Sequence, residues 1–404
     1  MSASAYRSME NKFKIHRRDF LKTSGVVGAG LVLGNPSQWY QDSSKQVESE
    51  RIKTNIEDAL KVPKTRYSLP GPYTGRVIEV YNSGATVDSK PNADVVHKMF
   101  EAGLKRLTQK DLKKSFKMFF QKDDMVGIKV NPVGAGLIST RLEVVDSIIE
   151  WLEENGMKRK NIVIWDRFDY MLTDAGFTAD RFPGIGIEGM QTMDDEAAEG
   201  KREDNSRWLD KDGNHVSAGN FDKEVYYWAD VEGPKDLPYL NQHVFNGKYS
   251  YYGKLLTKKL TKIINVPVFK NTGNGVSMAT KNIGYGAVCN TNRLHRPLFF
   301  DVCVDVLAFP VVRDKLVLNI TDGLIGQYDG GPAGNAQFTY VYNTLFFATD
   351  PFALDMICHR LMVEKRKSMG INVNEHPRFT DYLRYAQRLG LGIADPEKIE
   401  HVRV

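Results

Sequence analysis

The feature that most constrains the fold is a strand–helix–strand succession in the first half of the chain. A strand pattern at 125–130 is followed by helical spacing of apolar residues over 142–152 and by a second strand pattern at 161–165. This order is typical of a βαβ unit, in which the two strands are parallel and the helix covers the sheet. The sequence therefore predicts an α/β fold with a mainly parallel sheet flanked by helices.

Local signals place other elements and their boundaries. The Thr140–Glu143 capping box predicts a helix start, and Asn155–Gly156 predicts the end of that helix. Asp350–Pro351 predicts an N-cap followed by a first-turn proline, while Asp355 is expected to bind backbone or a neighbouring helix. Further strands are predicted at 76–81, 315–320 and 345–348, and further helices at 93–107, 351–362 and 378–389.

The first 34 residues resemble a twin-arginine export signal. Arg17 and Arg18 stand in a basic segment that precedes a short, weakly apolar run at 23–33. This run is too short for a stable membrane span and fits a signal-peptide core. The resemblance implies handling by the twin-arginine translocation machinery and a location in the periplasm or cell envelope. No small-residue cleavage site follows Leu33 directly, so membrane contact is expected only through this segment, if it stays uncleaved.

The rest of the chain is predicted to form a linker and one large domain. Residues 35–70 are polar with little periodicity and are interpreted as the linker, and 71–404 as the α/β domain. An irregular insertion at about 178–258 is rich in aromatic residues, which either line a substrate face or pack the core of a small β subdomain. Within it, 210–214 faintly resembles a calcium loop but lacks the third acidic position and the distal glutamate, so we interpret it as a turn.

Charge and cysteine content argue against two classes of protein. The chain carries a formal charge of +5, but residues 1–34 contribute +4 (six basic against two acidic residues), so nucleic-acid binding is not predicted. The cysteines, Cys289, Cys303 and Cys358, lie far apart and number only three. This chain alone therefore does not supply the four ligands of an iron–sulfur cluster.

The stretch 265–297 is the strongest candidate for a functional loop. A buried-strand pattern at 263–269 opens into a segment rich in Gly, Asn, Ser and Thr. Six residues, Lys270 to Gly275, separate that strand from the next apolar segment, so a loop and not a tight hairpin is expected. Loops at strand ends disproportionately carry function, and this one is predicted to form one wall of a positively charged cleft.

Polar residues stand at the ends of several predicted strands. The pairs are Lys129 with Asn131, Asp166 with Arg167, and Lys270 with Asn271. The carboxyl ends of parallel strands meet at one edge of a sheet, where α/β proteins bind ligands, and converging cations bind carboxylates or phosphates. The sequence therefore predicts a small anionic ligand, with binding residues Asn131, Lys270, Asn282, Arg293 and Gly323.

Candidate catalytic groups lie in the same segments. A desolvated lysine beside other cations loses basicity and acts as a base or Schiff-base former. One histidine and two carboxylates, His295, Asp166 and Asp322, either bind a divalent metal or act as general acid and base with an orienting partner. The residues assigned catalytic roles are Lys129, Lys281, His295 and Asp166.

Six short motifs, taken in order, resemble the domain-of-unknown-function family 362. They are VGIKVN at 126–131, NVPVFK at 265–270, KNxG at 281–284, TDGLIG at 321–326, GGP at 330–332 and ATDPFALD at 348–355. The likeness covers about residues 76–390 and implies architecture more than activity. Many relatives look exported, as this chain does. Some relatives carry ferredoxin-type cysteine clusters, which this chain lacks.

Two functions fit these features. The first is an exported enzyme that acts on a small anionic substrate, with or without a bound metal. The alternative is a non-catalytic ligand- or cofactor-binding accessory protein of a periplasmic redox or envelope system. Turnover that depends on Lys129 and Lys281 would support the first, whereas a tightly retained ligand without turnover would support the second.

Overall fold

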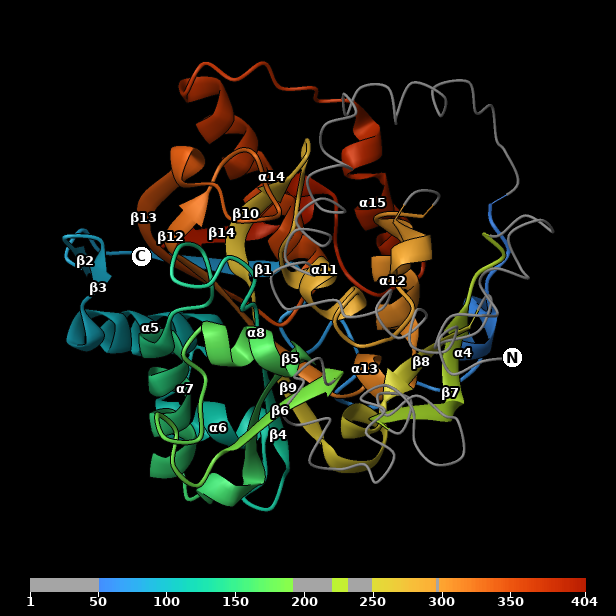
Figure 1. Cartoon of the computed structure of the whole chain (residues 1–404), viewed down its shortest axis with the longest axis horizontal. Helices are drawn as coiled ribbons and strands as arrows, with labels where there is room; N and C mark the ends of the chain where they lie inside the picture. Colours follow the sequence, from blue (N-terminus) through green and yellow to red (C-terminus); the bar gives the residue numbers. More distant parts are fainter. Residues whose placement is uncertain (1–50, 192–219, 232–248, 296–297) are drawn as a thin grey trace, which may run out of the picture. The chain divides into compact units, whose positions relative to one another are not determined.

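A ten-stranded sheet is the main element of the chain in the residues that the computed structural model describes, which are 51–191, 220–231, 249–295 and 298–404 (Figure 1). All elements given below belong to the compact unit of residues 52–404. The strand order is β14 (Glu400–Arg403), β1 (Arg76–Tyr81), β13 (Thr339–Ala348), β12 (Leu316–Gln327), β9 (Lys262–Val266), β4 (Val126–Val130), β5 (Ile162–Phe168) and β6 (Gly186–Gln191). Two more strands, β10 (Val268–Thr272) and β11 (Gly275–Val276), join this sheet through β12.

The sheet is mainly parallel, as the strand–helix–strand pattern predicts. Neighbouring strands are parallel from β12 through β9, β4 and β5 to β6, and α7 (Leu142–Glu154) connects β4 to β5. Among the long strands in the described part of the chain, only β13 is antiparallel to both of its neighbours, β12 and β1. The predicted α/β fold is therefore confirmed.

Helices cover both faces of the sheet. On one face α5 (Ala93–Thr108), α6 (Leu112–Phe119) and α7 form the main apolar core with the sheet, including Ile128 and Val130 of β4. On the other face α11 (Ala279–Gly284), α12 (Asp301–Ala308), α14 (Pro351–Ser368) and α15 (Asp381–Arg388) pack together (Figure 1). Because side chains alternate along a strand, Lys129 points away from the main core and towards α11.

Several predicted boundaries agree with the structure. Strand β1 spans the predicted residues 76–81, and α7 ends at Glu154 with Asn155 as its C-cap and Gly156 in the left-handed region at a φ of 90°. Asp350 caps α14, because its side chain accepts hydrogen bonds from two backbone N–H groups of the first turn, and Pro351 follows as the first residue. These signals are local, so the sequence alone is sufficient to read them.

The predicted Thr140–Glu143 capping box was wrong. Arg141 occupies the N-cap position of α7 and provides no side-chain cap. Thr140 Oγ1 instead donates to the Val266 carbonyl at 2.8 Å and accepts from Asn131 N at 2.8 Å. Thr140 thus ties the end of β4 to the end of β9, which are distant in sequence.

The loop predicted from Lys270 onwards is a strand followed by a tight hairpin. Pro267 separates β9 from β10, and Lys270 lies inside β10, where every residue is buried. Thr272 pairs with Gly275 of β11, so only two residues form the turn. The first of them, Gly273, has a φ of 54°, as two-residue hairpins with glycine at this position require. Likewise, the TDGLIG motif continues the buried strand β12 instead of ending it.

The insertion begins later than predicted, because β6 at 186–191 belongs to the main sheet. In its described part, β7 (Phe221–Trp228) and β8 (Tyr249–Gly253) form a separate antiparallel pair. The hydroxyls of Tyr227 and Tyr252 donate to Asp305 Oδ2 at 3.0 Å and to the carbonyl of the next α12 residue at 2.9 Å. These aromatic residues therefore pack a small β structure against α12. The predicted turn at 210–214 lies outside the described residues, as do two further aromatic residues of the insertion, Trp208 and Tyr239.

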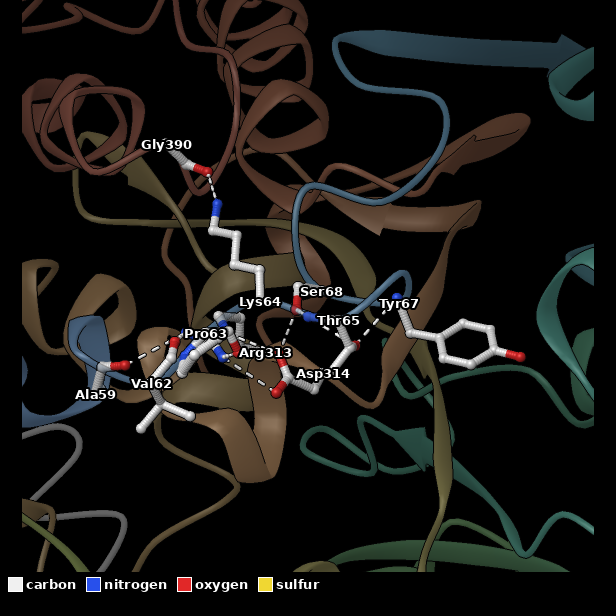
Figure 2. Close-up of polar contacts among 10 residues, drawn as sticks. All are labelled: Ala59, Val62, Pro63, Lys64, Thr65, Tyr67, Ser68, Arg313, Asp314 and Gly390. Carbon is white, nitrogen blue, oxygen red and sulfur yellow. Dashed lines mark hydrogen bonds and ion pairs between the residues drawn. The ribbon is translucent and has the colours of Figure 1, made fainter.

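The segment 52–70, predicted as the end of a linker, is bound to the folded unit. It contains α4 (Ile56–Leu60), and Arg313 lies at the end of α13 (Pro310–Arg313). Arg313 donates to the carbonyls of Ala59 in α4 and of Val62 and Pro63 after it, at 3.0–3.3 Å (Figure 2). Arg313 is 1% exposed and pairs with Asp314, whose carboxylate also accepts from Ser68 Oγ at 2.5 Å. The guanidinium thus ties the end of this short helix and the residues that follow it to α13.

Replacing Arg313 by alanine is expected to lower the free energy of unfolding by about 3 kcal/mol, because three carbonyls and a carboxylate lose their shared donor. Urea denaturation measures this loss. The matched control is Arg384→Ala, since Arg384 forms an exposed pair with Asp381, and there a change below about 1 kcal/mol is expected. Equal losses in the two variants would contradict the anchoring role of Arg313.

Candidate functional site

Lys129 lies at the centre of a buried polar network at the ends of β4 and β5. Lys129 and Asp166 are 1% and 6% exposed. The Lys129 ammonium donates to Asp166 Oδ1 at 2.5 Å, to the Val130 carbonyl at 2.8 Å and to Asn282 Oδ1 at 3.2 Å. Each of its three N–H groups therefore has an acceptor. Burial lowers the pKa of Lys129, and the charge of Asp166 opposes that shift.

Two asparagine amides connect Lys129 to Lys270. Asn282 Oδ1, which accepts from Lys129, also accepts from Asn131 Nδ2 at 3.1 Å. Asn131 Oδ1 in turn accepts from Lys270 Nζ at 3.0 Å. The network thus joins β4, β10 and α11, and five predicted site residues lie in it: Lys129, Asp166, Asn131, Lys270 and Asn282.

Two further asparagines extend the network across the sheet and were not predicted as site residues. Lys129 lies beside Asn265 of β9, which lies beside Asn319 of β12. Asn265 Oδ1 accepts from Asn282 Nδ2 at 2.8 Å, and Asn265 Nδ2 donates to Asn319 Oδ1 at 2.9 Å. A single asparagine inside an otherwise apolar strand was the signal available, because a buried amide needs polar partners.

Lys270 has no carboxylate partner among the described residues. Its Nζ donates to Asn131 Oδ1 at 3.0 Å and to the Val133 carbonyl at 3.4 Å, both of which are neutral acceptors. Burial, reinforced by the nearby charge of Lys281, lowers the pKa of Lys270 from 10.5 to about 7. Roughly half of these amines are therefore neutral near pH 7.

Lys281 lies on α11 beside aromatic rings. Its Nζ is 4.9 Å from the centre of the Tyr285 ring and 5.6 Å from that of Phe299. It forms neither a hydrogen bond nor an ion pair with the residues of the described ranges. The rings favour the charged ammonium, whereas burial lowers its pKa. The His295 ring packs against Tyr285 with 4.4 Å between ring centres, so His295 shares this aromatic wall.

Asp355 fixes the helix that carries Lys281 and Asn282. Its carboxylate accepts from Ala279 N at 2.8 Å, Thr280 N at 3.0 Å and Thr280 Oγ1 at 2.6 Å. The N–H groups of a first helical turn have no intrahelical partners, so Asp355 completes the start of α11. The expectation that Asp355 binds backbone or a neighbouring helix is confirmed. Burial raises the pKa of Asp355 to about 6.

Two predicted site residues are engaged elsewhere. Arg293 donates to the Ala229 carbonyl at 3.1 Å and to Ser250 Oγ at 3.2 Å, so it contacts the β7–β8 region. Asp322 is fully buried and accepts from Arg141 N at 2.7 Å and from Leu324 N at 3.0 Å, at the start of α7. Burial raises the pKa of Asp322 to about 6. Both residues thus bond to groups outside the Lys129 network.

Gly323, predicted to bind substrate, lies in a packed part of β12. A Cβ atom there would stand 2.8 Å from a carbonyl oxygen of β13. At Gly326 a Cβ atom would stand 2.3 Å from the Phe269 carbonyl, and at Gly331 2.2 Å from the Asn271 carbonyl. Gly326 and Gly331 thus permit the close approach of β10, the strand that carries Lys270, whereas Gly323 permits that of β13.

The predicted metal ligands are not assembled into one site. Asp166 pairs with Lys129, Asp322 binds backbone at the start of α7, and His295 packs against Tyr285. No three His, Cys, Asp or Glu side chains form a group that would hold a metal ion, as far as the structure describes the chain. All three cysteines are buried and unbonded to one another.

The fold and the N-terminal sequence define an exported α/β protein. Residues 14–34 match the signal sequence of the twin-arginine translocation pathway, which directs the chain to the periplasm or cell envelope. Residues 236–360 match the domain of unknown function DUF362, so the chain carries a domain of that family. No curated protein matches the chain. In the described ranges, no helix has the length and apolar character needed to cross a membrane.

The DUF362 match contains five of the six motifs that suggested the family. They include NVPVFK with Lys270 and KNxG with Lys281 and Asn282. The VGIKVN motif, with Lys129, precedes the matched residues 236–360. The network therefore combines residues inside the matched segment with β4 and β5, which lie before it.

Between about pH 7 and pH 10.5, the free energy of unfolding of the native protein is expected to rise with pH when compared with that of Lys270→Met. These two limits are the pKa values of Lys270 in the folded and in the unfolded state. In this range the unfolded chain binds more protons at Lys270 than the folded chain, so stability increases with pH. Urea denaturation across this range measures the difference. The buried carboxyls of Asp322, Asp350 and Asp355, with pKa values of about 6, titrate below it. A difference that stays constant with pH would contradict the lowered pKa.

A double-mutant cycle on Lys129→Met and Asp166→Asn is expected to give a coupling energy of about 2 kcal/mol or more, because each single change leaves a buried polar partner unpaired. Urea denaturation of the four proteins measures it. The control cycle uses Lys61 and Asp58, an ion pair at 3.3 Å whose side chains are 73% and 68% exposed. A coupling below about 0.5 kcal/mol is expected for it. Similar couplings in both cycles would refute a special role for the buried pair.

Proposed function

We propose that this exported protein is an enzyme that acts on a small anionic substrate bound beside Lys270 and Lys281. The observation that supports it is the charge balance of the network. Lys129 and Lys270 share one hydrogen-bonded network, and Lys281 lies on α11 next to Asn282 of that network. Asp166 is the one carboxylate paired with any of these three amines among the described residues. An ammonium group removed from water needs an opposite charge, and a carboxylate or phosphate substrate supplies it.

The different environments of the lysines support catalysis over passive binding. Lys129 is held in its charged form by Asp166, and the rings beside Lys281 favour charge there as well. Lys270 combines neutral acceptors with a pKa of about 7. An amine that is neutral near physiological pH serves as a general base or a nucleophile. The charged Lys129 and the reactive amine of Lys270 then share one network, and Lys281 adds a second cation on the helix that supplies Asn282.

Asp166 and His295 complete the proposed chemistry as proton-transfer groups. Asp166 keeps 6% of its surface exposed and is bonded to the Lys129 ammonium, through which it reaches the network. His295 packs against Tyr285, whose ring also lies 4.9 Å from Lys281 Nζ, so its imidazole lines the same aromatic wall as Lys281. A non-catalytic ligand-binding protein needs the cations but has no use for an amine of lowered pKa, which is why we favour the enzyme.

Lys281→Met is expected to weaken the binding of inorganic phosphate and of oxalate at least tenfold, about 1.4 kcal/mol, because the variant removes a cation that no group of the described chain neutralises. Isothermal titration calorimetry measures both ligands. The matched control is Lys113→Met on the exposed side of α6, which should bind like the native protein. Unchanged affinity in Lys281→Met would overturn the proposed site. Binding without turnover of any small carboxylate or phosphate ester would support the accessory-protein alternative.

A further inference from the structure

We propose that the aromatic wall formed by Tyr285, His295 and Phe299 makes the Lys281 site one for an aromatic carboxylate. The carboxylate lies on the Lys281 ammonium, and the ring of the ligand packs against His295 and Phe299. This inference rests on the proposed function and names the substrate class for the same site.

The three rings of the aromatic wall contact one another and Lys281. The centres of the Tyr285 and His295 rings are 4.4 Å apart, and the Phe299 ring centre lies 5.8 Å from that of His295 and 6.4 Å from that of Tyr285. Lys281 Nζ lies 4.9 Å from the centre of the Tyr285 ring and 5.6 Å from that of Phe299. One ammonium and three rings therefore form a single cluster.

Hydrogen bonds hold two of these rings without the help of Lys281. Tyr285 Oη donates to the Phe299 carbonyl at 2.7 Å, which joins the end of α11 to the residues before α12. His295 Nδ1 lies 3.0 Å from the Thr291 carbonyl, and it must donate there because a carbonyl only accepts. A wall that is already ordered loses little conformational freedom when a ligand binds.

Lys281 is the member of the cluster that lacks an anionic partner. Its ammonium forms neither a hydrogen bond nor an ion pair within the described ranges. Ring faces attract the cation, but a carboxylate adds a full opposite charge and strong acceptors for its N–H groups. The side chains of Lys281, His295 and Phe299 are each half-buried. A ligand that reaches this ammonium therefore also meets the two rings.

The aromatic wall determines what the ligand carries besides its carboxylate. An aromatic ring placed against His295 and Phe299 gains edge-to-face or offset-stacked contacts in addition to the burial of its surface. A saturated ring of similar size gains only from the burial. A small aliphatic anion satisfies Lys281 but leaves the rings without a partner. The ligand class that satisfies both the cation and the rings is an aromatic carboxylate.

The test is isothermal titration calorimetry of the purified full chain with benzoate and two analogues. Cyclohexanecarboxylate has the same charge and a ring of similar size without an aromatic face, and benzyl alcohol has the aromatic ring without the charge. Benzoate is expected to bind at least fivefold tighter than cyclohexanecarboxylate and at least tenfold tighter than benzyl alcohol. Equal affinity for the two carboxylates would overturn the proposed class.

Variants of the wall locate the binding site. Phe299→Leu is expected to weaken benzoate binding at least fivefold and to leave oxalate binding unchanged, whereas Phe299→Tyr, which keeps a ring, should bind benzoate like the native protein. Lys281→Met should weaken the binding of both anions at least tenfold. The control is Tyr81→Leu, since Tyr81 is an aromatic residue of β1 that is 58% exposed, and no change is expected there. Benzoate binding that survives Phe299→Leu unchanged would refute the role of the wall.

The outcomes separate this inference from the proposed function. Circular dichroism and urea denaturation show whether each variant is folded. Binding of phosphate and oxalate that depends on Lys281, without a preference for benzoate, would refute the aromatic ligand and leave the proposed function standing. If Lys281→Met changed the binding of none of these anions, both would be refuted.

Discussion

The buried ion pair between Lys129 and Asp166 is the interaction on which the site depends. An ammonium removed from water costs several kcal/mol unless a charge and full hydrogen bonding compensate it. That requirement determines the surroundings of β4: the neighbouring strand β5 supplies the carboxylate of Asp166, and α11 supplies the amide oxygen of Asn282. A helix of six residues has little stability alone. Helix α11 is held by Asp355 at its start and by the amide network at its centre.

The two faces of the sheet differ in polarity and in what they contribute to the protein. The face covered by α5, α6 and α7 is apolar and supplies hydrophobic stabilisation. The face covered by α11 carries a row of polar side chains, Lys129, Asn265 and Asn319, on three adjacent strands. Such a row is tolerated only when every amide has a partner, which explains why the amides are joined in series. The rigid apolar face keeps these strands in register, so the amines stay in place.

The sequence predicts most elements and part of the site, and the failures share one cause. The βαβ order, β1 and the Asp350 cap depend on neighbours in sequence, and they were predicted correctly. Thr140 and Lys270 were assigned to a capping box and a loop because their true partners, Val266 and Asn131, are more than a hundred residues away. The strand-end rule brought Lys129, Asp166 and Lys270 together as candidates. It did not reveal Asn265 or Asn319, because a single polar residue in an apolar strand does not indicate which residue it forms hydrogen bonds with.

Strand β1 has a consequence for the order of events in the cell. It pairs with β13 and with β14, which lie far later in the sequence, and the segment before it is anchored by Arg313. One sheet edge therefore cannot close before β14 has been translated. The signal at 14–34 emerges from the ribosome well before these strands, but the twin-arginine route carries folded proteins. The export signal can therefore be recognised long before the domain has folded, and the sheet topology imposes a delay between translation and transport.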